Sequence, residues 1–176
     1  TIAIIKGEIC VGLDKSELEK VARSSNIKKV SKREIGTATT MEWNGATTVS
    51  STMQIARMCR IRVFSTGGIG GAHRNSNKTF DVSQDLIALS NTPMVVVSSG
   101  AKSILDLPKT LEVLETFGVC LLGYQTDEFP SFYSRSSGLE KITKATSTEQ
   151  VTRVFLKNEL LKLQSATLVV NPIPKE

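Results

Sequence analysis

The sequence predicts an α/β fold, with a mostly parallel central sheet between two layers of helices in a three-layer α/β/α arrangement. Two observations carry this prediction. Short apolar runs typical of strands alternate with amphipathic stretches that have helical spacing. Two of the runs, residues 62–65 and 93–98, have the length of buried parallel strands, and each ends in a loop of small residues. We expect residues 1–176 to form a single α/β domain.

The start of the chain predicts a hairpin followed by a helix. Residues 1–12 have the pattern of two short strands joined by a tight turn at a glycine. A helix is expected to begin after an N-cap at Asp14 or Ser16, because these short polar side chains accept backbone hydrogen bonds. Its apolar residues Leu18 and Val21 are three positions apart, so we expect both on a buried face.

The next part of the chain predicts one short extended segment, one irregular segment and one helix. Residues 28–33 form a strand or an extended loop, and residues 37–44 are irregular, with Trp43 as a packing residue. The helix begins near Thr47 or Thr48. Hydroxyls and free amides in its first turn either contact an anion or simply cap the helix, and the sequence favours neither. The residues expected to face inward are Met53, Ile55, Ala56 and Cys59.

The second half of the chain continues the alternation of strands and helices. Helix boundaries are marked by capping and stop signals, such as Ser147 and Gly118. Residues 126–138 carry three aromatics around Pro130 and form a lid, a subunit contact or a packed surface loop. The remaining expected elements are a helix from Leu105 or Pro108 to Phe117, a strand over 119–124, a helix over 147–163 and a strand over 167–170.

The composition favours some partners and disfavours others. The chain has 176 residues, of which 40% are apolar and 22% are charged, as is ordinary for a globular domain. Its net charge of +5 indicates an anionic partner. The basic residues are scattered and form no basic helix face with aromatics, so a small anionic ligand is favoured over nucleic acid. No apolar run has the length of a membrane span.

The cysteines indicate the cellular compartment. Cys10, Cys59 and Cys120 are widely spaced and lie in apolar runs. They form no CxxC motif or Cys/His cluster, so a zinc site is not predicted. We expect buried free thiols in a reducing compartment, which places the protein inside the cell, in the cytoplasm or in an organelle.

The candidate site lies in the two loops of small residues. TGGIGGAH follows the run at 62–65, and SSGAK follows the run at 93–98. Because ligands bind beyond the carboxyl ends of strands in open α/β sheets, we expect both loops at one rim. An acidic turn over 81–85 starts a short helix between them, and Lys102 closes the second loop. A lysine, two carboxylates and open backbone amides indicate a site for a phosphorylated or carbonyl-bearing small molecule.

The glycines and the histidine leave alternatives open. A GGxGG run serves tight turns as well as ligand contacts. A dinucleotide site would need GxGxxG at the start of a helix, whereas polar residues 73–78 follow here, so a nicotinamide-binding domain is disfavoured. His73 is either an acid/base group or, together with Arg74, an anchor for the loop.

Seven motifs occur along the chain in a fixed order. They are KVSKRE (29–34), GATTVSSTM (45–53), FSTGGIGGAHR (64–74), TFDVSQDL (79–86), GAKSILDLPKTLEVLETFGV (100–119), GYQTDEFPSFYSRSS (123–137) and NPIPKE (171–176). In order and spacing they resemble the pseudouridine-5'-phosphate glycosidase family, also called the indigoidine synthase A-like family. The resemblance covers nearly all of this chain but only the middle of a family member. We therefore expect an incomplete domain that lacks both ends.

The resemblance implies a reaction and a set of site residues. The family reversibly cleaves the C–C bond of pseudouridine 5'-phosphate, giving uracil and ribose 5-phosphate in pseudouridine catabolism. Lys102 corresponds to the lysine that attacks C1' of the sugar and opens its ring to form an imine. A divalent metal, Mn²⁺ or alternatively Mg²⁺, is implied on Asp81. The implied substrate contacts are Lys29, Val49, Ser83, Gln84 and Asp85. Full-length members are homotrimers, with no nucleic-acid or membrane partner expected.

The implied chemistry is physically reasonable for these residue types. A C-glycosidic bond has no heteroatom to protonate, so its cleavage needs an electron sink at C1', which a lysine imine supplies. Asp81 and Asp85 are hard oxygen ligands that suit Mn²⁺ or Mg²⁺ held largely by waters. Simpler roles exist, with Asp81 as a helix N-cap and Lys102 as a surface lysine at a helix start. A cation there fits the helix dipole poorly, which favours the functional role.

The chain also departs from the family pattern. The resemblance places the general acid, a glutamate, N-terminal to residue 1, and an asparagine-bearing region beyond residue 176. Residues 73–78 read HRNSNK rather than HRGAE, and Gln84 replaces a small residue. The two substitutions are tolerable. The missing general acid motivates a second hypothesis, in which the chain is a truncated, non-catalytic fragment that binds sugar phosphate or a partner subunit.

Overall fold

A computed structural model describes residues 1–140 and 142–174 of the chain. The chain divides into two compact units, unit 1 over residues 1–60 and unit 2 over residues 61–176, and each is described by itself. The expectation of a single domain over 1–176 stays a prediction. Of the helices in the described residues, none combines the length and the apolar character needed to cross a membrane.

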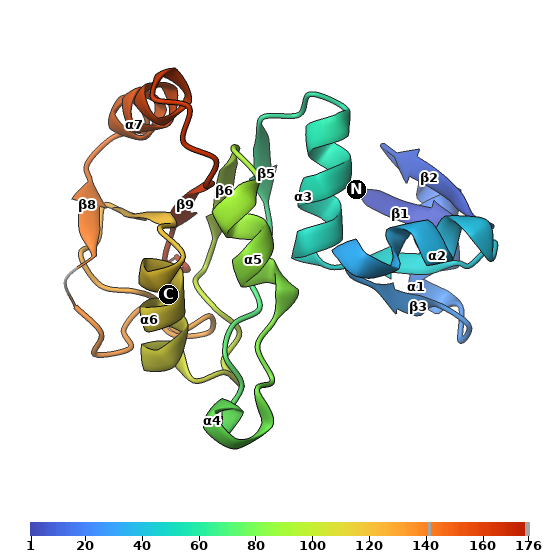
Figure 1. The fold of residues 1–176 in the computed structure, drawn as a ribbon, viewed down its shortest axis with the longest axis horizontal. Coiled ribbons are helices and arrows are strands. Elements are labelled where there is room, and N and C mark those ends of the chain that lie inside the picture. Colours follow the sequence, from blue (N-terminus) through green and yellow to red (C-terminus); the bar gives the residue numbers. More distant parts are fainter. Residues whose placement is uncertain (141, 175–176) are drawn as a thin grey trace. The chain divides into compact units, whose positions relative to one another are not determined.

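Unit 1 is built on a small mixed sheet. Its elements are β1 (Ile2–Ile5), β2 (Glu8–Val11), α1 (Lys15–Arg23), β3 (Lys28–Val30), the 3-10 helix η1 (Lys32–Glu34), α2 (Ile35–Thr40), β4 (Gly45–Thr47) and α3 (Val49–Met58). The sheet order is β2-β1-β4-β3. Figure 1 labels the strands β1, β2 and β3 of this sheet. The antiparallel pair of β1 and β2 confirms the expected hairpin, and β3 runs parallel to β4.

A small apolar cluster stabilises unit 1. Ile4, Val30 and Ala38 are fully buried, and Trp43 packs against them. The Lys28 ammonium lies 3.7 Å from the centre of the Trp43 ring, which is a cation–π geometry. The prediction that Trp43 is a packing residue is therefore confirmed.

Two segments of unit 1 differ from the sequence predictions. Residues 35–40 form helix α2 rather than an irregular segment, since burial of Ala38 in the core outweighs the weak helix propensity of the three threonines there. Asp14 caps α1 through a capping box, as expected. However, Leu18 is 40% exposed, and none of the described α1 residues is buried. The start of this helix is fixed by its N-terminal cap, and its apolar residues do not form a buried face.

Helix α3 follows its prediction except at its C-terminal end. Three of its inward residues are confirmed as buried, namely Met53, Ile55 and Ala56. Cys59 is exposed, because the helix ends at Met58 and Cys59 caps it. All three cysteines are free, as expected, but Cys10 and Cys120 are only half-buried. The Ser51 hydroxyl in the first turn donates to the Val30 carbonyl at 2.6 Å, which is an internal contact.

Unit 2 contains a parallel sheet. Its elements are β5 (Val63–Ser65), α4 (Ser76–Thr79), α5 (Gln84–Asn91), β6 (Val95–Ser98), α6 (Leu107–Thr116), β7 (Cys120–Tyr124), β8 (Thr143–Ala145), α7 (Thr148–Leu160) and β9 (Thr167–Val170). The five strands found in the described residues stand in the order β5-β6-β9-β7-β8, and each neighbouring pair is parallel. All four residues of the central strand β9 are buried, as expected of a strand covered on both faces.

Helices cover this sheet and produce the expected α/β arrangement. One face packs against α7, where Val95, Leu122 and Val169 from the sheet meet Val151 and Phe155 from the helix. Strand side chains alternate between the two faces of a sheet. The fully buried neighbours Val96 and Leu168 therefore point to the opposite face. Helices α5 and α6 lie side by side (Figure 1). The predicted α/β class with a mostly parallel sheet is confirmed.

The edges of the unit 2 sheet differ from the predictions. Strand β5 was expected to be buried, but Val63 is 59% exposed because β5 is an edge strand with one neighbour. Strand β8 at the other edge was not predicted. Helix α7 begins after the expected N-cap Ser147. Helix α6 begins at Leu107, between the two starts expected from the sequence, and Asp106 is its N-cap. Phe117, the expected last residue of the middle helix, is its C-cap.

Candidate functional site

The two loops of small residues lie together at the carboxyl ends of β5 and β6. Residues 66–73, here named the glycine loop, follow β5, and residues 99–102 follow β6. Ile69 N–H donates to the Gly100 carbonyl at 3.0 Å, and Lys102 N–H donates to the Ile69 carbonyl at 3.1 Å. This parallel pairing confirms that both loops share one rim of the sheet.

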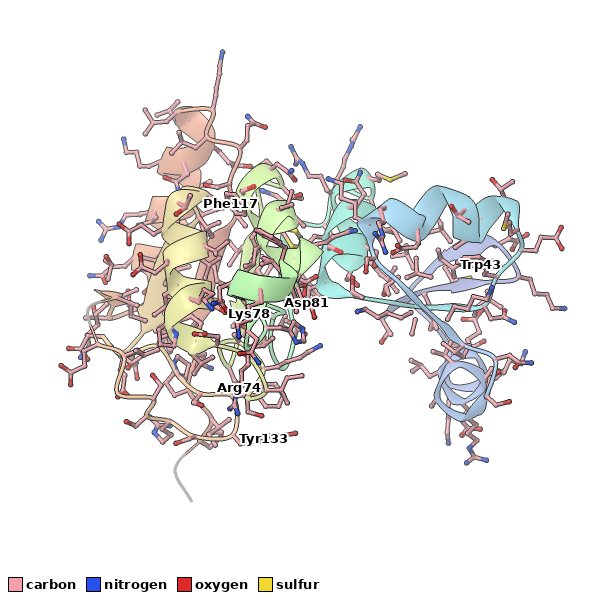
Figure 2. All side chains as sticks on the ribbon, turned by 60° about the horizontal axis from the view of Figure 1, so that its bottom comes forward. Trp43, Arg74, Lys78, Asp81, Phe117 and Tyr133 are labelled. Carbon is pink, nitrogen blue, oxygen red and sulfur yellow. The ribbon has the colours of Figure 1, made fainter. Side chains whose placement is uncertain are left out.

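The glycine loop also pairs with the segment that leads into α5. Ala72 bridges Val82 in an antiparallel sense, and His73 N–H donates to the Asp81 carbonyl at 2.9 Å. Ser83 N–H donates to the Gly71 carbonyl at 3.0 Å. The glycine loop therefore lies between the segment 81–83 and the segment that carries Lys102. Figure 2 labels Asp81, which precedes α5 in the chain, together with Arg74 and with Lys78 on α4.

A buried carboxyl group fixes the centre of the glycine loop. Asp85 is 4% exposed, and its Oδ2 accepts a hydrogen bond from Gly70 N–H at 2.8 Å. The Ser83 hydroxyl is the N-cap of α5 and accepts from Asp85 N–H at 3.2 Å. A side chain at Gly70 would overlap the Ser83 hydroxyl and would place its Cβ 2.7 Å from Asp85 Oδ2. Glycine is required here by the available space.

Helix α6 holds the other side of the glycine loop. Asp106 N–H donates to the Ala72 carbonyl at 2.9 Å, and the buried Thr110 hydroxyl accepts from Ala72 N–H at 3.0 Å. The Asp106 carboxylate caps α6 by accepting from Lys109 N–H at 3.1 Å. This backbone hydrogen bond, the side-chain contact with the Lys109 ammonium and its positive charge lower the pKa of Asp106. Sequence reasoning did not identify Thr110, because no motif spacing marks it.

The aromatic segment after β7 crosses the rim as a strap. Residues 126–140 are here named the strap loop. Phe132 N–H donates to the Ser99 carbonyl at 3.1 Å, and Ser131 bridges Gly100. Gly100 has a φ of +90°, and a Cβ there would overlap the Pro130 carbonyl. Phe129 is fully buried, so the packed-loop alternative holds for that ring, whereas Tyr133 is 77% exposed (Figure 2).

Glu128 folds the strap loop onto itself. Its carboxylate accepts hydrogen bonds from the Ser136 hydroxyl at 2.7 Å and from the backbone N–H groups of Ser137 and Gly138. These bonds to the ionised form, led by the one from the Ser136 hydroxyl, lower the pKa of Glu128. The residue was not singled out from the sequence, since its partners lie eight to ten positions away.

The seven residues that the resemblance named fall into both units. In unit 1, Lys29 is exposed on β3, and Val49 is buried as the first residue of α3. In unit 2, Ser83 and Gln84 are half-buried. Lys102 is exposed at the rim. Unit 2 thus connects Lys102, Asp81 and Ser83 to one loop through backbone hydrogen bonds, and Asp85 to the same loop through its carboxyl group. Lys29 and Val49 are described only within unit 1.

The surroundings of Asp81 decide what it can bind. Its side chain is 64% exposed, and its Oδ2 lies 3.8 Å from His73 Nδ1. Among the described residues there is no group of three His, Cys, Asp or Glu side chains that could hold a metal ion. An open carboxylate of this kind fits a divalent ion that keeps most of its waters. The His73 backbone is bonded on both sides, to Asp81 and Ser76, which favours its anchoring role.

Comparison with known proteins identifies the family. The family model described as "Indigoidine synthase A like protein" matches residues 1–176. The chain belongs to the indigoidine synthase A-like family. Pseudouridine-5'-phosphate glycosidases from Legionella pneumophila and Thermosipho africanus are 49% and 51% identical to it over 174 and 176 residues. These alignments cover 99% and 100% of this chain but only 56% and 58% of the relatives.

Two crystal structures share the fold. An indigoidine synthase A-like protein from Thermotoga maritima superposes with a TM-score of 0.93 at 41% identity, over 99% of this chain and 58% of that one. A prealnumycin C-glycosynthase in complex with ribulose 5-phosphate superposes with a TM-score of 0.94 at 40% identity, with the same coverage. The chain therefore spans a little over half the length of the family members it matches, and the resemblance noted in the sequence is confirmed.

The packing of the glycine loop predicts that it does not tolerate a methyl group at its centre. Gly70→Ala should lower the free energy of unfolding by about 1–3 kcal/mol, because the new Cβ displaces Ser83 and Asp85. Gly67→Ala in the same loop is the control, since its Cβ would meet Phe132 at an ordinary 3.7 Å. Urea unfolding of both variants measures the difference, and equal stabilities would contradict this account of the loop.

The lowered pKa of Glu128 predicts a pH-dependent contribution to stability. A carboxyl group whose pKa is lower in the folded state stabilises the protein at pH values above the ordinary pKa of glutamate. This stabilisation is lost as the pH falls through the folded-state pKa. Glu128→Gln should therefore lower stability at pH 7, and the difference from the unmodified chain should shrink below about pH 4. The exposed Glu112→Gln on α6 is the control for urea unfolding at each pH. A difference that does not depend on pH would argue against the ionised carboxylate.

Proposed function

We propose that this chain carries the nucleophile and part of the substrate site of a pseudouridine-5'-phosphate glycosidase. The supporting observation is that Lys102 and the segment 81–85 are hydrogen-bonded to the two sides of one glycine loop. Relatives near 49% identity bear this activity in their names, and a neighbour of known structure was crystallised with ribulose 5-phosphate. The substrate is thus a sugar phosphate joined to uracil by a C–C bond.

In the proposed reaction the Lys102 amine attacks C1' of the ribose. The N–C1' bond forms while the C1'–O4' bond breaks, and the ring oxygen takes up a proton. The nitrogen lone pair then forms a C=N bond as the C1'–C5 bond breaks. The electron pair of the C1'–C5 bond goes to C5 of uracil, which is protonated. Water hydrolyses the imine and returns the free amine and ribose 5-phosphate. The resemblance places the proton donor outside residues 1–176.

The residues of this chain supply position and contacts for these steps. Lys102 N–H is tied to Ile69, so the backbone that carries the amine is held against the glycine loop. Ser83, Gln84 and Asp85 form the first turn of α5 and its cap and are proposed to contact the substrate, as are Lys29 and Val49. A reacting amine on an ordered loop needs less reorganisation to reach C1'.

Asp81 is the proposed ligand of a divalent ion, Mn²⁺ or Mg²⁺. Its exposed carboxylate, with few protein ligands nearby, fits an ion that retains several waters. Such an ion would supply positive charge to orient and polarise the oxygens of the bound substrate.

We also propose that the full-length protein is a homotrimer. The cellular location inferred from the cysteines stays a prediction.

A non-catalytic role is the second candidate. It is favoured by one observation, namely that the chain spans 56% to 58% of the length of the glycosidases it matches. In this case the chain would bind sugar phosphate or a partner subunit without releasing uracil. Uracil release from pseudouridine 5'-phosphate, measured for residues 1–176 and for a version extended at both ends, separates the two candidates.

Reductive trapping tests the nucleophile. Borohydride should fix ribose 5-phosphate on Lys102 as a secondary amine, detected as one peptide by mass spectrometry. Lys102→Ala should lower the labelled fraction at least tenfold, because it removes the amine whose backbone is bonded to the glycine loop, whereas Lys157→Ala on the exposed surface of α7 should leave it unchanged. An adduct that persists in Lys102→Ala at the same level would refute the assignment of the nucleophile.

Metal titration tests Asp81 without relying on turnover. Asp81→Asn should weaken Mn²⁺ binding at least tenfold in calorimetry or electron paramagnetic resonance, because a neutral amide replaces the anionic ligand. Asp127→Asn, at an exposed aspartate on the strap loop, is the control and should bind Mn²⁺ within twofold of the unmodified chain. Equal affinities in the two variants would rule out Asp81 as the main protein ligand.

A further inference from the structure

Thr110 is a residue to which neither the motifs nor the resemblance assigned a role. Its hydroxyl nevertheless makes two hydrogen bonds in the interior of unit 2. The residue is on α6 and is fully buried. Its Oγ1 donates to the Asp106 carbonyl at 2.7 Å, one turn earlier in the same helix. The hydroxyl proton is therefore used within the helix. The oxygen is left as an acceptor, and it accepts from Ala72 N–H at 3.0 Å.

The glycine loop approaches Thr110 so closely that a side chain at Gly71 does not fit between them. A Cβ at Gly71 would overlap the Thr110 hydroxyl and would lie 2.7 Å from its Cγ2. Ala72 itself is fully buried, so its N–H has no access to bulk water. A buried N–H that loses its partner is costly, and Thr110 is the partner that this geometry provides.

Thr110 and Asp85 hold the glycine loop in the same way, each by accepting a hydrogen bond from one of its backbone N–H groups. The carboxyl of Asp85 accepts from Gly70 N–H, and the hydroxyl of Thr110 accepts from Ala72 N–H, two residues further on. Side chains from two helices thus hold consecutive parts of one loop. Asp85 stands among the proposed substrate contacts, whereas Thr110 lies on α6 and reaches the site only through the loop.

The hydrogen bonds of the loop lead from Thr110 to Lys102. Asp106 N–H donates to the Ala72 carbonyl, and Leu105 N–H donates to the Lys102 carbonyl. Lys102 N–H in turn donates to the Ile69 carbonyl. We propose that Thr110 is a positioning residue that sets the place of the Lys102 backbone through the glycine loop. The expected effect on the reactivity of the Lys102 amine rests on the proposed function. The effect on the Lys102 backbone can be measured without that function.

Substitutions at Thr110 separate the hydroxyl from the shape. Thr110→Val keeps the size and the branching but removes both hydrogen bonds, whereas Thr110→Ser keeps the hydroxyl and loses one methyl group. Thr167→Val is the control, because Thr167 is also a fully buried threonine of unit 2, and its hydroxyl accepts a long hydrogen bond of 3.5 Å from Asn158. Should Thr110→Val not fold, Thr110→Cys replaces it, since its side chain is no larger than that of threonine and its thiol forms only weak hydrogen bonds.

The first measurement is amide hydrogen exchange by NMR on the chain without ligand. In Thr110→Val the N–H groups of Ala72 and Lys102 should exchange at least tenfold faster than in the unmodified chain. Thr110→Ser and Thr167→Val should leave both within threefold. Faster exchange at Ala72 with no change at Lys102 would overturn the inference, since the loop would then not transmit the contact.

The second measurement is the rate of borohydride trapping as a function of ribose 5-phosphate concentration. Thr110→Val should lower the maximal rate at least tenfold and leave the half-saturating concentration within twofold, because the amine is misplaced while the substrate contacts persist. Thr110→Ser should restore the rate. An unchanged maximal rate in Thr110→Val would refute the positioning role. If the unmodified chain forms no adduct, the proposed function fails, and exchange at Lys102 alone decides the role of Thr110.

Discussion

The buried hydrogen bond from Gly70 N–H to the Asp85 carboxyl is the contact on which the arrangement of the rim depends. It can form only because Gly70 has no side chain, since a Cβ would occupy the space of Ser83 and Asp85. Around this point the loop pairs with two separate segments, so its buried backbone groups find partners on both sides. The small residues of this loop therefore serve close packing, and the loop is hydrogen-bonded on two sides although it is irregular.

The sequence predicted those elements of the fold that are buried on both faces or clearly capped. Strands β6 and β9 are short apolar runs because a parallel sheet hides both of their faces. Strand β8 has the sequence Thr-Lys-Ala, with only Ala145 buried, and so it carries no apolar run that could reveal it. Strand β5 shows the opposite error, because its apolar Val63 lies at the sheet edge. Sequence periodicity reports side-chain type, whereas the position of a strand in the sheet is set by tertiary pairing.

The candidate site was predicted in its loops but not in its supports. The shared rim followed from the parallel sheet, and the individual residues followed from the family resemblance. Thr110 could not be found in this way, since its hydrogen bond joins residues 38 positions apart and any buried threonine has the same sequence appearance. Glu128 was missed for a related reason, because acceptance of backbone N–H groups depends on the turn that the strap loop makes. Such long-range hydrogen bonds are a property of the folded chain.

The proposed reaction has two halves that depend on different parts of the protein. Formation of the N–C1' bond needs a placed amine, and Lys102 lies on a loop whose backbone is hydrogen-bonded to the glycine loop. Cleavage of the C1'–C5 bond leaves an electron pair on uracil that must be protonated, and the resemblance places that proton donor outside residues 1–176. The position of the proposed nucleophile is thus set within unit 2, independently of the proposed acid. Adduct formation and uracil release can therefore be lost separately. A chain that forms the adduct without releasing uracil is thus distinguished from one that completes the reaction.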